Sequence, residues 1–142
     1  MMEASRMDDS ASLAFLDDQI KKLKSISEHL LIHSIDVSQW DIYVTLTRAK
    51  DGKEHTIRLR CDNGYPITAP SVTFVSPVDF KMEGVQFWPD DGERAFKRTS
   101  SPPFICIPGT REYYEHHREV QVAPRDVSLT KIVAELVTMM NR

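Results

Sequence analysis

Apolar residues recur at spacings of three and four between positions 13 and 31, which is the period of an amphipathic helix. These residues are Leu13, Phe15, Leu16, Ile20, Leu23, Ile26, Leu30 and Leu31. A second run with this spacing covers 127–140, where Asp126 or Ser128 can serve as N-cap. The sequence therefore predicts one helix near each end of the chain.

The segments between the two helices alternate apolar and polar residues, which predicts strands with one face on a core. The alternation covers residues 40–47, 56–61 and 71–76. The Asp51-Gly52 pair between the first two segments suits a tight hairpin turn. With a short apolar segment around Cys106, we expect an α+β fold whose antiparallel sheet has about four strands.

Length and charge limit the kind of protein this can be. The 142 residues suit one domain, for which we expect the bounds 10–142, after a polar and acidic mobile tail at 1–9. A net charge of -3 gives no basic surface for nucleic acid. We also expect no membrane partner and a cytoplasmic location, since no apolar run approaches about 18 residues and no signal peptide is recognisable.

The two cysteines call for different interpretations. Cys61 continues the inward alternation of Ile57 and Leu59, which predicts a buried core residue. Cys106 lies in a short apolar run between two prolines and a Pro-Gly turn, and it can be a nucleophile, a metal ligand or a small hydrophobe in a buried strand. Because a structural zinc site uses four ligands in close pairs and Cys106 has no such partner nearby, we expect no metal and no cofactor. The signatures of cysteine proteases are also absent.

The order of the elements resembles the ubiquitin-conjugating enzyme fold. The stretch "YPITAP" at 65–70 is similar to the tyrosine-proline turn of that family, and "RDVSLTKIVAELVTMM" at 125–140 is similar to the helix after its catalytic segment. The stretch "PPFICIPGTREYYEHH" at 102–117 resembles the divergent prokaryotic branch. Members of that branch are similar to proteins whose genes are clustered with those of a ubiquitin-like protein, an activating enzyme and a zinc-dependent deconjugating peptidase.

The resemblance implies a function for Cys106. At this position the family has the cysteine that accepts a ubiquitin-like protein from an activating enzyme as a thioester and passes it to an acceptor amine. The resemblance also implies these partners: the modifier, the activating enzyme and the deconjugating peptidase. An acceptor cysteine is expected to be partly exposed and flanked by groups that favour the thiolate.

The sequence departs from the family pattern at a residue that matters for the chemistry. The histidine-proline-asparagine triplet that eukaryotic members have before the cysteine is missing, since the only asparagines are Asn63 and Asn141. An oxyanion donor and a general base would have to come from other polar groups. The accessory candidates downstream of the cysteine are Arg111, Tyr114, His116 and His117.

Two further expectations concern partners. Lys21, Lys22 and Lys24 should lie on the solvent side of the first helix, where related folds engage the activating enzyme. The last two C-terminal helices of the family are missing from the sequence, so we expect uncovered apolar surface and a homodimer or a heteromeric complex. The alternative to an enzyme is a noncatalytic relative that binds a ubiquitin-like protein or a partner enzyme.

Overall fold

The computed structural model describes residues 9–62, 64–76, 96–97, 100–123 and 126–141. It contains helix α1 (Asp9–Ser25), strands β1 (Ile32–Ser38), β2 (Asp41–Thr47), β3 (Glu54–Arg60), β4 (Ser71–Ser76), β5 (Phe96–Lys97) and β6 (Phe104–Ile105), and helices α2 (Arg111–His116) and α3 (Leu129–Met140). The fold is α+β, as the sequence predicts. Residues 1 to 8, which form most of the expected tail, lie outside the described residues, and Asp9 already belongs to α1.

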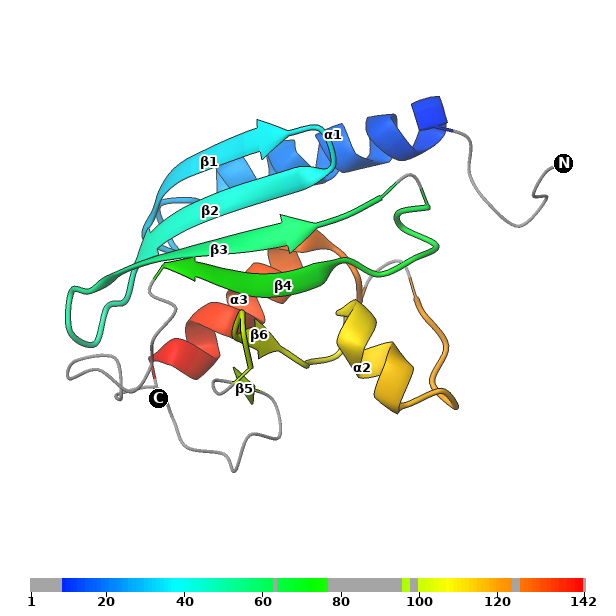
Figure 1. The fold of residues 1–142 in the computed structure, drawn as a ribbon. Helices are drawn as coiled ribbons and strands as arrows, with labels where there is room; N and C mark the ends of the chain where they lie inside the picture. Colours follow the sequence, from blue (N-terminus) through cyan, green and yellow to red (C-terminus); the bar gives the residue numbers. More distant parts are fainter. Residues whose placement is uncertain (1–8, 63, 77–95, 98–99, 124–125, 142) are drawn as a thin grey trace, which may run out of the picture.

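The strands form one antiparallel sheet in the order β1-β2-β3-β4-β6-β5 (Figure 1). The three strands expected from alternation are confirmed as β2, β3 and β4, and Gly52 in the turn between β2 and β3 has a φ of +74°. The expectation of about four strands is wrong, because the described part of the sheet has six. The strands that the sequence pattern did not indicate are β1 and the two-residue β5.

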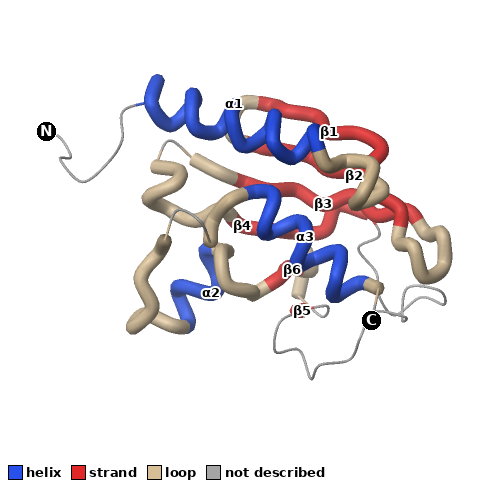
Figure 2. Tube along the Cα trace, turned by 180° about the vertical axis from the view of Figure 1, so that it is seen from behind, coloured by secondary structure: helices blue, strands red, loops and turns tan. Residues whose placement is uncertain are grey.

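Helices α1 and α3 cover the same face of the sheet and pack against each other (Figure 2). The buried face of α1 carries Leu16, Ile20 and Leu23, which join the apolar residues of β2 to β4 and of α3 in one core. Inside this core the backbone N–H of Leu129 donates to Oε1 of Gln19 at 3.1 Å. The two helices are therefore held together by apolar packing and by a buried hydrogen bond across most of the chain.

The boundaries of the helices differ in part from those expected. Ser128 caps α3, as predicted, by accepting a hydrogen bond from the backbone N–H of Lys131. The helix expected over 13–31 is wrong beyond Ser25, because turns follow and Leu31 adopts a φ of +56°. The carbonyl of Leu31 accepts from the backbone N–H of Thr47 at 3.0 Å, so the chain enters the sheet here. None of the helices among the described residues is long and apolar enough to cross a membrane.

Candidate functional site

Cys106 directly follows β6 and is buried without belonging to the connected core cluster. Ile105 before it and Ile107 after it are members of that cluster, whereas Cys106 is not, although only 9% of its surface is exposed. Because side chains alternate along an extended segment, the two isoleucines point toward the core and Cys106 points to the other side. The backbone N–H of Phe74 in β4 donates to the carbonyl of Pro103 at 2.9 Å, which fixes this segment to the sheet. The thiol therefore lies just below the surface.

The turn after the cysteine leads into α2 and has little conformational freedom. Gly109 has a φ of +104°, and a Cβ at this position would lie 2.2 Å from the carbonyl oxygen of Asp126, so only glycine fits. Thr110 caps α2, since its hydroxyl donates to the carbonyl of Ile107 and accepts from the backbone N–H of Tyr113. This turn holds α2 in a fixed position beside the cysteine.

His116 is the residue of α2 that reaches the thiol. Its Nδ1 lies 3.9 Å from Sγ of Cys106 and 2.9 Å from the carbonyl oxygen of Glu112. Since a carbonyl oxygen can only accept, Nδ1 must carry the proton when it bonds to Glu112. This proton points to the carbonyl of Glu112 and can reach the sulfur only as the longer, weaker branch of a shared hydrogen bond, and in this state Nδ1 is unable to take the thiol proton.

The surroundings of Cys106 do not favour the thiolate, contrary to the expectation from the sequence. Burial raises the pKa of the thiol above its ordinary value, and the nearby carboxylates of Glu112 and Glu115 raise it further. Lys97 on β5 acts in the other direction and lowers the pKa. Near neutral pH the protonated thiol therefore predominates, and Lys97 is the group that shifts the balance toward the thiolate.

Arg111 makes contacts that fasten the start of α2 to the loop before β4. Its Nη2 lies 3.2 Å from Oδ2 of Asp62, and its Nε donates to the carbonyl of Ala69 at 3.2 Å. Its backbone N–H also donates to the carbonyl of Pro70 at 2.8 Å. These contacts support a positioning role for Arg111, whereas the sequence suggested an oxyanion donor.

Tyr114 and His117 contact other groups than the thiol. Tyr114 packs against the core, and burial raises its pKa although the backbone of Gly109 forms a hydrogen bond with its hydroxyl. The ring of His117 stacks on Tyr113 with 4.3 Å between the ring centroids, and its Nδ1 lies 3.8 Å from Oε1 of Glu119. Of the four accessory candidates, His116 alone has a described contact with Cys106.

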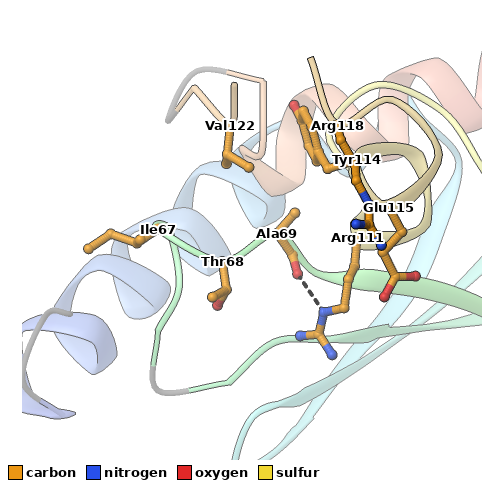
Figure 3. Close-up of a pocket in the computed structure, with 8 residues that line it drawn as sticks. All are labelled: Ile67, Thr68, Ala69, Arg111, Tyr114, Glu115, Arg118 and Val122. Carbon is orange, nitrogen blue, oxygen red and sulfur yellow. Dashed lines mark hydrogen bonds between the residues drawn. The ribbon is translucent and has the colours of Figure 1, made fainter. Parts of the chain in front are cut away.

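A pocket of about 350 Å³ lies between α2 and the loop before β4 (Figure 3). It is lined by Ile67, Thr68, Ala69, Arg111, Tyr114, Glu115, Arg118 and Val122. Figure 3 shows Arg111 reaching from α2 to the carbonyl of Ala69 across one end of this space. Residues of α2 and of the tyrosine-proline turn form walls of this pocket, and Cys106 is not among its lining residues.

The other residues that the sequence singled out are the lysines on α1 and the second cysteine. Lys21, Lys22 and Lys24 are exposed, and Lys22 pairs with Asp18 at 3.1 Å one turn earlier. Cys61 is a member of the core cluster with 2% of its surface exposed, and burial raises its pKa to about 12. The prediction that Cys61 is a core residue is confirmed.

No family model matches this chain, and no curated protein matches it. The chemistry of the site therefore rests on the residues around Cys106. Within the described part of the chain, no three His, Cys, Asp or Glu side chains gather as they would around a metal ion. What remains is a single thiol near the surface, beside an imidazole N–H and a lysine, which is suited to forming a covalent bond to sulfur.

Sequence reasoning missed three charged residues near the thiol: Lys97, Glu112 and Glu115. Lys97 was missed because the stretch around it has no clean period, so β5 was not indicated. The acidic residues were missed because the sequence analysis predicts no helix or strand over 111–116. Thr110 directly after a Pro-Gly turn is an N-cap signal that indicates α2 and would have placed these residues on one helix.

Proposed function

We propose that this chain is a ubiquitin-conjugating-like enzyme that carries a ubiquitin-like protein as a thioester on Cys106 and passes it to an acceptor amine. The observation that carries the proposal is the position of Cys106 outside the core cluster, between two core isoleucines and 3.9 Å from Nδ1 of His116. A cysteine that served only to fill the core would share the environment of Cys61.

The order of elements supports the same proposal. A helix, an antiparallel meander, a cysteine-bearing segment and a further helix follow one another as in the ubiquitin-conjugating fold, with the tyrosine-proline turn between β3 and β4. The stretch around Cys106 resembles the prokaryotic branch, so we propose an activating enzyme, a ubiquitin-like modifier and a deconjugating peptidase as partners. An acceptor thiol has to stay reduced, which favours the cytoplasm.

The first half-reaction exchanges one thioester for another. The thiolate of Cys106 attacks the carbonyl carbon of the activating enzyme's thioester, the new C–S bond forms, and the activating enzyme's thiolate leaves. Because burial raises the pKa of Cys106, the N–H of His116 and the charge of Lys97 would support the sulfur as it becomes charged. In the second half-reaction an amine attacks the same carbonyl, the C–N bond forms and the C–S bond to Cys106 breaks, and the amine proton ends on the departing sulfur or in solvent.

The test is a charging assay with the cognate activating enzyme, modifier and ATP, followed by nonreducing and reducing gels. We expect the wild-type chain to form an adduct with the modifier that added thiols cleave. Cys106→Ser should form an oxyester that resists thiols, and Cys106→Ala should form no adduct. An adduct that persists in Cys106→Ala, or none in the wild type, would reject the enzyme.

The second candidate function is a noncatalytic relative that binds a ubiquitin-like protein or a partner enzyme. The low exposure of Cys106 and its raised pKa favour this candidate, because both slow the chemistry of a thiol. Binding of the modifier with equal affinity by wild type and Cys106→Ala, without charging of either, would establish it. Light scattering of the chain alone and with its partners then tests the expected homodimer or heteromeric complex.

A further inference from the structure

The pairing of β5 with β6 brings a lysine onto the same face as Cys106. Lys97 lies opposite Phe104 in the antiparallel register, so their side chains share a face. Two residues along the chain from Phe104, Cys106 points to that face as well, because Ile105 and Ile107 point into the core. Lys97 on β5 and Cys106, the residue that directly follows β6, are therefore placed diagonally across this pairing.

The distance and the charge both couple the two side chains. Diagonal neighbours in an antiparallel pair lie about 7–8 Å apart at the backbone, within reach of long side chains, and lysine ends in an amine on a flexible four-carbon stem. Lys97 is half-buried and is the cation whose charge acts on Cys106. The other lysines of the described ranges lie on α1, in the hairpin between β2 and β3, and on α3.

We propose that Lys97 is an internal acceptor, to which an acyl group bound as a thioester on Cys106 moves to form an amide. This inference rests on the proposed function and adds a self-modification site to it. The ammonium of Lys97 first loses a proton to water. Its nitrogen then attacks the thioester carbonyl, the C–N bond forms and the C–S bond breaks, and the second amine proton ends on the departing sulfur.

The consequence is a brake on the proposed conjugation. An amide resists thiols, so transfer to Lys97 returns a reduced Cys106 but leaves a bulky group attached beside it. A chain that carries the modifier on Cys106 and meets no external amine would therefore modify and block itself. A chain that meets an acceptor amine quickly would transfer the modifier before this happens.

The test uses a probe that needs no activating enzyme: the mercaptoethanesulfonate thioester of N-acetylglycine, incubated with the full chain at pH 8. Hydroxylamine then removes thioesters and leaves amides, and peptide mass spectrometry locates the acetylglycyl group. We expect an amide on Lys97 that forms after the thioester on Cys106. Its rate should be at least tenfold that of direct acylation of Lys131, the reference lysine on α3.

Three variants sharpen the result. Cys106→Ala should lose the Lys97 amide at least tenfold. Lys97→Arg keeps the positive charge and should form the Cys106 thioester as wild type does, whereas Lys97→Gln should form it more slowly because that charge is lost. In both variants the thioester should be longer-lived. Lys131→Arg, the matched control, should leave both products unchanged. The proposal is overturned if Cys106 resists the probe, if its thioester forms without a Lys97 amide, or if Cys106→Ala acylates Lys97 as fast as wild type.

Failure of the two proposals can be told apart. If activating enzyme and modifier leave Cys106 uncharged while the probe acylates it and then Lys97, the conjugating function fails and the intramolecular transfer stands. If the modifier forms a thioester on Cys106 and neither it nor the probe moves to Lys97, only the self-modification fails.

Discussion

Sγ of Cys106 and Nδ1 of His116 lie 3.9 Å apart, with the proton on Nδ1 already engaged by the carbonyl of Glu112. This geometry gives the histidine only a weak role in supporting negative charge on sulfur, because the same proton reaches the sulfur only as the longer branch of a shared hydrogen bond. It leaves the deprotonation of an incoming amine, for which the sequence suggested a histidine, to the other ring nitrogen or to solvent. The predictions below separate these roles.

His116→Ala should slow alkylation of Cys106 in the folded chain. The variant loses a hydrogen bond to sulfur that is long and shared with Glu112, so it is weaker than a full hydrogen bond to a charged group. We expect the thiolate to lose about 0.5–1.5 kcal/mol of stabilisation, which slows alkylation about two- to tenfold. Iodoacetamide kinetics followed by mass spectrometry measure the effect. His117→Ala is the control, because its ring stacks on Tyr113, and equal rates for both variants would contradict the assignment.

Alkylation of Cys106 should depend steeply on pH. Burial raises the pKa of this thiol above its ordinary value of 9.0, so the reactive thiolate increases about tenfold per unit between pH 7 and pH 9. Lys97→Gln should move the profile to higher pH, because the lowering influence of its charge is lost. A rate that levels off below pH 8 in the wild type would contradict the raised pKa.

Cys61→Ser should destabilise the fold and spare the reactivity of Cys106. A hydroxyl would replace a thiol that has 2% of its surface exposed, so we expect a loss of about 1–3 kcal/mol in the free energy of unfolding. Urea denaturation measures it, and Cys106→Ser, outside the core cluster, should lose less. Cys61 should stay unmodified by iodoacetamide until the chain unfolds, since its pKa is about 12 and the core encloses it.

Arg111 and Asp62 should couple in a double-mutant cycle of stability. Both are partly exposed, so the pair itself is expected to contribute about 0.2–1 kcal/mol. Arg111→Ala should lose more than this, because the hydrogen bond to Ala69 is also removed, while alkylation of Cys106 changes less than twofold. If Arg111→Ala instead preserves stability and abolishes charging with the modifier, the residue is an oxyanion donor after all.

Replacing Lys21, Lys22 and Lys24 by Gln should slow charging by an activating enzyme if α1 docks it. Glutamine is chosen over glutamate because an acidic residue near the C-terminus of α1 interacts unfavourably with the helix dipole. Each such residue would cost about 0.3–1 kcal/mol of stability. The melting temperature should then stay within a few degrees. The control is Lys50→Gln with Lys53→Gln at the hairpin between β2 and β3. Charging that matches wild type at low salt would refute docking by these lysines.

The central strands could be predicted from the sequence because each has one face in the core. The alternation at 40–47 and 56–61 reflects a buried inner face and a half-buried outer one. Strand β1 was missed because it lies at the edge of the sheet, where most of its side chains are exposed and its apolar residues do not alternate. Ile26 and Leu30 extended the helical spacing past Ser25 although the backbone had already turned.

Of the groups near the candidate site, the sequence pointed to Cys106 and to His116, which lies 3.9 Å from it. Cys106 was singled out by its prolines, its neighbours and a resemblance, all of which are local in sequence. Its coupling to Lys97 depends on strand register, and that of Arg111 to Asp62 depends on how α2 meets a loop 49 positions earlier. Such pairings arise from tertiary packing, which single-sequence periodicity does not encode.

The hydrogen bond between Gln19 and Leu129 links residues 110 positions apart, whereas β1 to β4 pair through short connections. Contacts between sequence neighbours form with less loop-closure entropy, so the meander is expected to assemble early and the two-helix layer late. A nascent chain would thus present its strands before α3 arrives. During that interval the segment that bears Cys106 would lack its packing, which would keep an incompletely synthesised chain from entering the reaction.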